Sequence, residues 1–186
     1  MQICIPANIR WQLYEKFEDV KLENKFAPVA LSIPICANPE DAIQKTKPVT
    51  RQLKGSFPQI YATYVLSLIV GFCIPTFMSR FMANNMSQPF TLAFSNTPGC
   101  LKPLHYAGME VDHIVPAMLC SGKCGVSVAM LSHCNFLKFS VMCDTSINSE
   151  PHKIKGQIEA AVERLIEYSK QPETKERRNS IHEMQK

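Results

Sequence analysis

Charge is the first thing that this sequence has little of. Asp, Glu, Lys and Arg make up 19% of its 186 residues, and the formal net charge is only +4. No run of Lys and Arg is interleaved with aromatic side chains, the pattern with which many proteins contact nucleic acids. We therefore predict no nucleic-acid partner. No internal repeat is visible either, so the length fits one domain or one half of a larger two-domain fold.

A secretory signal is also missing from the start of the sequence. The segment from Met1 to Pro6 has no basic leader, and Pro6 interrupts its apolar run. Cysteines are too sparse for the disulfide scaffold of a small secreted domain, and most of them lie in apolar runs. We expect reduced thiols and an intracellular, non-secreted protein. The eight cysteines are Cys4, Cys36, Cys73, Cys100, Cys120, Cys124, Cys134 and Cys143.

Histidine pairs suited to catalysis are absent. No two histidines are adjacent, and no aspartate precedes a glycine. His133 lies between Ser132 and Cys134 on an expected strand, where neighbouring side chains point to opposite faces. We therefore expect a hydrogen-bonded histidine on a sheet face rather than a nucleophilic centre. The five isolated histidines are His105, His113, His133, His152 and His182.

The cysteines offer one spacing that resembles a metal site. Cys120 and Cys124 are separated by three residues, and Cys134 and Cys143 follow them. Two cysteines on strands would have to converge on the loop that carries the first pair. Small apolar or loop cysteines explain the pattern better, so we predict no metal site and no cofactor.

Hydrophobic patterning predicts an α/β (α+β) fold in which helices cover a mixed sheet. Asn38 and Pro39 are typical of a helix start, Gly55 of its end, and Pro48 should kink or shorten the helix between them. The other expected elements are strands over 2–5, 29–36, 90–94, 109–115, 126–134 and 137–143, a helix over 75–86, and a helix that begins near Pro151.

A constrained turn follows the expected strand at 90–94. Ser95 and Asn96 can bond neighbouring main-chain groups, Pro98 fixes its own φ, and Gly99 accepts a positive φ. A loop of this composition at the end of a buried strand shapes a cleft or braces a domain joint. A tight turn chosen only for its geometry is the alternative.

The longest uncharged segment covers residues 55–79, which is 25 residues, between Lys54 and Arg80. Its strongly apolar part, Ile60–Ile74, is bounded by prolines and is shorter than the roughly 20 apolar residues that a bilayer-spanning helix needs. Three interpretations remain open: a buried core helix, which we favour, a helix on a membrane surface, and a transmembrane span. Lipid contact would run through Ile60–Met82.

Several short motifs follow one another in a fixed order. They are Ile5–Arg10, Glu23–Phe26, Leu31–Pro34, Phe94–Gly99, the turn at Gly108, Gly125–Val128 and a hairpin that ends in Asp144. This ordered set, across residues 2–169, resembles the C-terminal domain of the wax ester synthase/diacylglycerol acyltransferase family. Members of that family resemble chloramphenicol acetyltransferase in fold and transfer an acyl chain from acyl-CoA to a lipid alcohol. The resemblance implies half of such a fold over residues 1–169, followed by a charged tail over 170–186.

The family's catalytic motif is missing from this chain. That motif, His-His-x-x-x-Asp-Gly, belongs to the N-terminal domain, and its second histidine is the general base that removes the proton of the attacking alcohol. The family's Asn-Asp motif is also absent, and Cys100 stands where the family commonly has a second proline. We therefore predict no catalytic residue here. The resemblance places these residues at a channel or domain interface: Asn8, Arg10, Asn24, Ser95, Asn96, Pro98, Gly99 and Gly108.

Two further patterns carry alternatives. Arg10 beside Asn8 could bind a phosphate such as that of CoA, although pairing with a carboxylate is the simpler role for an arginine. Arg177-Arg178-Asn179-Ser180 suits a basophilic kinase, with Ser180 as the phosphorylation site, whereas a solvated tail is the simpler interpretation.

Two functions are consistent with the sequence. In the first, which we favour, the chain is a non-catalytic accessory or structural subunit that docks on other protein subunits, within a membrane-associated assembly. In the second, it is the C-terminal half of a working O-acyltransferase whose His-His motif lies in another chain or another segment. Acyl-CoA would then be a substrate, with a fatty alcohol or a diacylglycerol as the acceptor.

Overall fold

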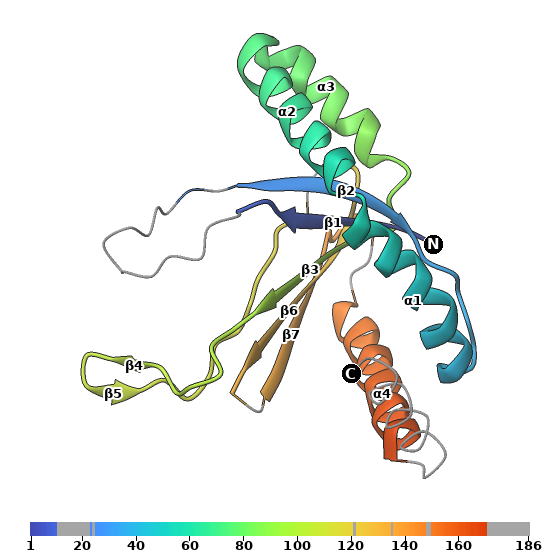
Figure 1. Cartoon of the computed structure of the whole chain (residues 1–186), viewed down its shortest axis with the longest axis vertical. Helices are drawn as coiled ribbons and strands as arrows, with labels where there is room; N and C mark the ends of the chain where they lie inside the picture. The colour runs from blue at the N-terminus through green and yellow to red at the C-terminus, as the bar shows by residue number, and fades with distance from the viewer. Residues whose placement is uncertain (11–22, 24, 121, 135, 148–149, 171–186) are drawn as a thin grey trace.

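The computed structural model describes residues 1–10, 23, 25–120, 122–134, 136–147 and 150–170. In this part of the chain a mixed sheet is combined with helices (Figure 1), which confirms the predicted α/β class. The strands are β1 (Gln2–Asn8), β2 (Phe26–Ser32), β3 (Leu92–Pro98), β4 (His105–Tyr106), β5 (Met109–Glu110), β6 (Val126–His133) and β7 (Phe136–Cys143). The helices are α1 (Pro39–Gly55), α2 (Phe57–Cys73), α3 (Thr76–Ser87) and α4 (Pro151–Lys170).

Five strands form the main sheet in the order β2-β1-β3-β6-β7. The two edge pairs, β1–β2 and β6–β7, are antiparallel, whereas β1–β3 and β3–β6 are parallel. The side chains buried most deeply belong to this sheet or border it, and none of the four helices has a buried residue in the described range. Among apolar residues the core is Ile3, Ile9, Ala27, Leu31, Cys124, Val128 and Ala129.

The sheet divides into two parts that meet along a very short seam. β1 and β3 pair only at Ile3 with Leu92 and at Cys4 with Ala93. Beyond these positions the β1–β2 ribbon turns away from the β3–β6–β7 layer, as Figure 1 shows. Among the described strands, none pairs with Ile5–Asn8 on the side toward β3, and none pairs with Phe94–Pro98 on the side toward β1. The divergence therefore leaves two open backbone edges.

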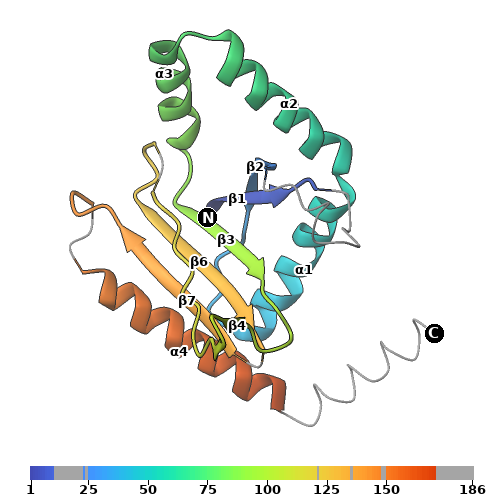
Figure 2. The same cartoon turned by 90° about the vertical axis from the view of Figure 1, so that its left-hand side faces the viewer.

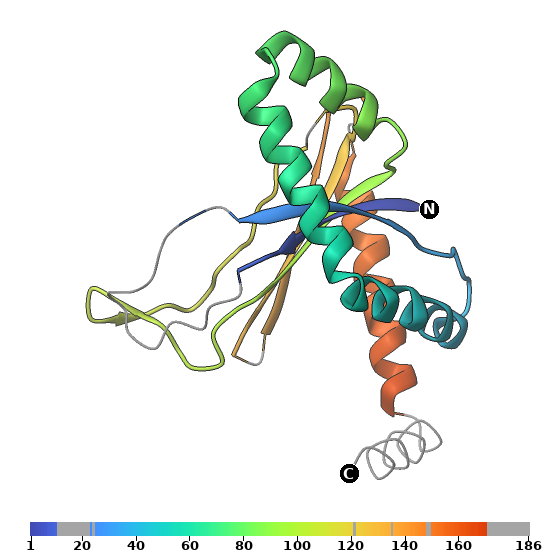
Figure 3. The same cartoon turned by 45° about the horizontal axis from the view of Figure 1, so that its top comes forward.

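The helices pack mainly at the two ends of this sheet. α2 and α1 contact β2, and α4 contacts both β7 and α1. α2 and α3 form a hairpin whose tip projects away from the strands (Figure 2 and Figure 3), while α2 also contacts β2. No single described helix is long and apolar enough to cross a bilayer. α1 and α2 meet the length and composition criteria only as a pair, and they are bent by 66° where they meet.

Local signals located most of these elements correctly. Asn38 caps α1, because its Oδ1 accepts a hydrogen bond from the Glu40 amide at 3.2 Å, and the helix ends at Gly55. Pro48 does not end the helix. Pro48 is exposed, so a water molecule can take the place of the main-chain hydrogen bond that proline cannot make. α3, the β6–β7 hairpin and α4 also lie where the sequence predicts them.

Three expectations about secondary structure are wrong. The second strand covers 26–32 rather than 29–36, because pairing with β1 sets its register and an edge strand tolerates Pro28. In place of a strand over 109–115 there is only the short β5. The favoured buried helix over 60–74 is α2, and α2 has no buried residue.

Loss of the Asn38 cap should destabilise the protein. Replacement by alanine (Asn38→Ala) leaves the Glu40 amide without its acceptor, and we expect a loss of about 1 kcal/mol in the free energy of unfolding. Urea unfolding followed by circular dichroism measures this loss. Asn38→Asp, which keeps an acceptor oxygen, should retain most of the stability, and an equal loss in both variants would contradict a capping role.

Candidate functional site

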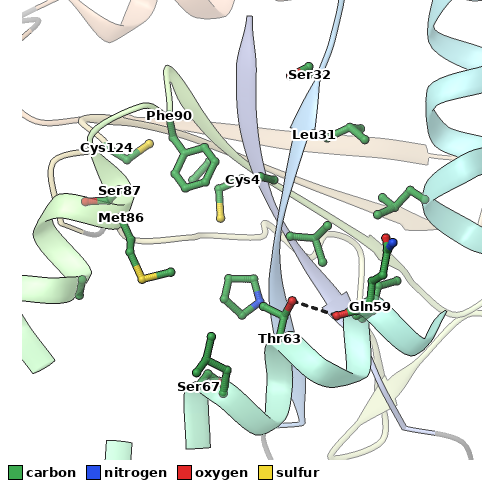
Figure 4. Close-up of a pocket in the computed structure, with 18 of the residues that line it drawn as sticks. Cys4, Leu31, Ser32, Gln59, Thr63, Ser67, Met86, Ser87, Phe90 and Cys124 are labelled. Carbon is green, nitrogen blue, oxygen red and sulfur yellow. Dashed lines mark hydrogen bonds between the residues drawn. The ribbon is translucent and has the colours of Figure 1, made fainter. Parts of the chain in front are cut away.

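An apolar cavity lies beneath the α2–α3 hairpin. It has a volume of about 940 Å³ and lies between the helices α1, α2 and α3 and the seam of the sheet. Figure 4 shows Cys4, Leu31, Phe90 and Cys124 on the sheet side and Gln59, Thr63, Ser67 and Met86 on the helix side. Cavities of this size hold drug-sized or lipid-like ligands in other proteins.

Among the described residues, the wall of this cavity contains no charged side chain and no histidine. It is made of aliphatic, aromatic, thioether, thiol, amide and hydroxyl groups. Five of its hydroxyls donate to carbonyl oxygens one turn earlier in the chain, at 2.7–3.0 Å, so their protons are already bound. The wall therefore presents little polarity to a ligand. These hydroxyls belong to Ser56, Thr63, Ser67, Ser79 and Ser87.

Two cysteines face the cavity from the sheet side, and both are poor nucleophiles. Burial raises the pKa of the Cys4 thiol, and the neighbouring Cys124 raises it further. Burial also raises the pKa of Cys124, although hydrogen bonds with the backbone of Val126 and Ala93 oppose part of that effect. Both side chains are therefore neutral thiols at pH 7 and line the wall as small apolar groups.

The open edges of β1 and β3 border the same seam. Asn8 ends β1, and its Oδ1 accepts a hydrogen bond from the Arg10 amide at 3.0 Å. The guanidinium Nη2 of Arg10 donates to the main-chain oxygen of Glu23, so this arginine stabilises the backbone after β1. It pairs with a carbonyl here rather than with the carboxylate that the sequence suggested.

Comparison with known proteins identifies this domain. The sequence profile of the WS/DGAT C-terminal domain matches residues 22–166, most of the chain. The chain belongs to this family. It is 31% identical over 87 residues to diacylglycerol O-acyltransferases described from Mycobacterium tuberculosis and Mycobacterium bovis, an alignment that covers 47% of this chain and only 19% of each relative.

A solved structure supports the same assignment at the level of the fold. The wax ester synthase/diacylglycerol acyltransferase from Marinobacter aquaeolei VT8 superimposes with a TM-score of 0.51 at 13% sequence identity. The match covers 75% of this chain and 34% of that protein. The chain thus corresponds to about a third of the solved acyltransferase, which confirms the resemblance read from the sequence motifs.

The family motif at 94–99 adopts a different conformation from the turn that its composition predicts. Ser95, Asn96 and Pro98 lie within β3 and pair with β6, at Ala129, Met130 and Ser132. Parallel pairing with β6, a strand far along the chain, overrides the local preference of these residues for turns. All three lie on the strand that borders the open seam.

Gly99 serves a purpose other than the predicted positive φ. The described glycines with positive φ are Gly108 and Gly122. A Cβ atom at Gly99 would lie 1.9 Å from the main-chain oxygen of Ser132, and the Gly99 amide donates to the Ser132 Oγ at 3.3 Å. Glycine is required here because two backbones approach closely.

Of the remaining predicted site residues, only Gly108 is described by the structure, and it does not join this seam. Gly108 has a φ of 80° in the turn between β4 and β5, a separate two-stranded sheet. Asn24, Ser180 and the tail beyond Lys170 lie outside the described residues, so these predictions stay untested.

Histidines and metal ligands are not gathered near the cavity in the described residues. His105, His113 and His152 are exposed, whereas His133 is buried. The expectation of a hydrogen-bonded His133 is wrong for Nδ1, which has no partner among the described residues, and its Nε2 lies 3.8 Å from the Cys134 sulfur. No described group of three His, Cys, Asp or Glu residues is placed to hold a metal ion.

The cavity itself was missed by the sequence analysis. Its wall on α2 combines the apolar residues Ile60, Leu66 and Val70 with the polar residues Gln59, Thr63 and Ser67, on one face of an apolar helix. Their spacing of four residues was the available signal, since one face of a helix repeats every three to four residues. High mean hydropathy over the whole segment obscured it.

Enlarging Gly99 should strain the joint between β3 and β6. In Gly99→Ala the new methyl group meets the Ser132 carbonyl, and we expect a loss of about 1–3 kcal/mol in the free energy of unfolding. Gly71→Ala is the matched control, because nothing lies within 4 Å of the added Cβ in α2. Urea denaturation of both variants checks this, and equal stability of the two would contradict the close approach.

Filling the cavity should remove its capacity for apolar ligands. Ala83 lines the cavity on α3, whereas Ala62 on α2 is exposed and does not. We expect Ala83→Trp to weaken binding of a fluorescent long-chain alcohol at least about tenfold, because the indole occupies space that the chain needs. Ala62→Trp should bind as the unmodified protein does. Equal binding by the two variants would place the ligand elsewhere.

Proposed function

We propose that this chain is a non-catalytic accessory or structural domain of an O-acyltransferase-type assembly. The single observation that supports this is the composition of the cavity wall, which offers apolar volume and no general base. Acyl transfer to an alcohol requires a group within hydrogen-bond reach that removes the hydroxyl proton. Neutral thiols with raised pKa values and hydroxyls bound to their own helices cannot perform that step at neutral pH.

The open seam supports a docking role. The unpaired edges of β1 and β3 present backbone amides and carbonyls in the described structure, and exposed strand edges bind other chains by adding a strand. Asn8, Ser95 and Asn96 lie along these edges. In this proposal the partner is another protein subunit or domain that inserts at the seam, and these polar side chains help to set its register.

A second function is favoured by the size of the cavity. About 940 Å³ of apolar space beside the docking seam is suited to one long hydrocarbon chain. In this version the chain is the C-terminal half of a working acyltransferase, and a separate N-terminal domain supplies the His-His motif. Acyl-CoA and a fatty alcohol or diacylglycerol would be its substrates.

Ester synthesis distinguishes these versions. The purified chain, incubated with radiolabelled long-chain acyl-CoA and a long-chain alcohol, should produce no ester above a protein-free blank, since the described part of the cavity lacks a base. Ester made by the chain alone would overturn the non-catalytic proposal. Ester made only after addition of a family N-terminal domain that carries the His-His motif would select the second function. The control is the same N-terminal domain without this chain.

A further inference from the structure

The α2–α3 hairpin carries a set of large, exposed apolar side chains outside the cavity. On α2 these residues recur at intervals of four, three, one and three, which places them on one helical face. They are exposed by 38–86% and do not line the cavity. The residues of this outer stripe are Tyr61, Val65, Leu68, Ile69 and Phe72.

The stripe continues around the tip of the hairpin onto α3. Phe72 is 86% exposed at the end of α2, and Phe77 and Phe81 are 74% and 68% exposed at the start of α3. Figures 1 and 3 show this tip as the part of the hairpin farthest from the sheet. Three phenylalanines of such exposure at one projecting point form an apolar patch of the kind that marks an interaction site.

The outer stripe differs from the cavity face of α2. Gln59, Thr63 and Ser67 line the cavity together with Ile60, Leu66 and Val70, whereas the outer stripe carries only aliphatic and aromatic side chains. No charge occurs from residue 55 to 79, and every residue from 68 to 75 is Leu, Ile, Val, Gly, Phe, Cys or Pro. The end of α2 and the turn that follows it are therefore the least polar part of the hairpin.

A lipid surface fits this pattern better than a protein partner does. Protein interfaces surround an apolar centre with polar groups that fix the orientation of the partner. The outer stripe of α2 has no such rim, and an uncharged surface gives no directional contact to a specific protein. Lipid requires none. The 17 residues of α2 are about 25 Å long, so the hairpin is suited to lie in one leaflet rather than to span both.

We infer that the α2–α3 hairpin inserts its tip into the hydrocarbon region of a lipid layer, through Phe72, Phe77 and Phe81. Arg80, in the second turn of α3 and next to Phe81, keeps its guanidinium at the headgroups and so limits the depth of insertion. Attachment depends on apolar contact, so it should occur on neutral phosphatidylcholine vesicles and persist at high salt. This inference concerns a surface outside the cavity and does not depend on the proposed function.

Tryptophan placed at the tip reports insertion. The chain has one tryptophan, Trp11, so the probe is Phe72→Trp in a Trp11→Phe background, and the matched control is Leu101→Trp, which is 89% exposed away from the hairpin. We expect phosphatidylcholine vesicles to shift the emission at position 72 to the blue, with quenching by brominated acyl chains, and to leave position 101 unchanged. Equal responses at both positions, or none at either, would overturn the inference.

Charge at the tip should abolish attachment. We expect Phe72→Glu with Phe77→Glu to weaken vesicle co-sedimentation at least about tenfold, because two side chains lose their burial in hydrocarbon. Leu101→Glu with Met109→Glu adds the same charge at exposed apolar positions elsewhere and should bind as the unmodified chain does. Retained binding by the tip variant would show that the chain attaches to vesicles through another surface, which overturns the inference. Emission at position 72 that is already blue-shifted without vesicles, and unchanged by them, would show that something other than lipid covers the tip.

Discussion

The architecture depends on two residue pairs, Ile3 with Leu92 and Cys4 with Ala93, that join the β1–β2 ribbon to the β3–β6–β7 layer. Ile3 is almost fully buried at this seam, and the deepest apolar side chains on either side of it belong to β2 and β6. No described helix residue is buried, so the fully buried apolar side chains all lie in the sheet strands or directly beside them, and the helix side chains are at most half-buried. A short seam between two stiff ribbons therefore sets the positions of everything else.

The cavity and the open edges both follow from this seam. The two ribbons are joined at only two residue pairs and then diverge, so one strand of each ribbon has an unpaired edge beyond the seam. The helices that bridge the two ribbons cannot pack closely against both of them. α2 contacts β2, while α3 approaches the chain near Ser87, where the Lys123 amide donates to the Ser87 Oγ at 2.8 Å. The volume between these two attachments is the cavity. The two open edges and the cavity are thus two results of one divergence.

Elements that depend on interactions between residues close in the sequence were predicted correctly. Elements whose conformation depends on a distant strand were not. The Asn38 cap, the β6–β7 hairpin and the start of α4 near Pro151 are specified within a few residues, and the structure has all three. Ser95–Pro98 has the composition of a turn, yet a parallel neighbour more than 30 residues away holds it extended, and no local signal reports that partner. Gly99 was singled out for the wrong reason, because a close approach to Ser132 is visible only once the two strands are paired.

The prediction of a buried α2 failed for a related reason. The mean hydropathy of a segment counts its apolar residues but does not report on which side of the helix they lie. The polar positions of α2 were therefore not recognised as a separate face. Those positions lie in the cavity wall beside Ile60, Leu66 and Val70, with the Thr63 and Ser67 hydroxyls bound to their own helix. A single helix therefore separates the apolar cavity from the exposed apolar stripe. Because both faces of α2 are apolar, no hydropathy average could tell which of them packs against the protein.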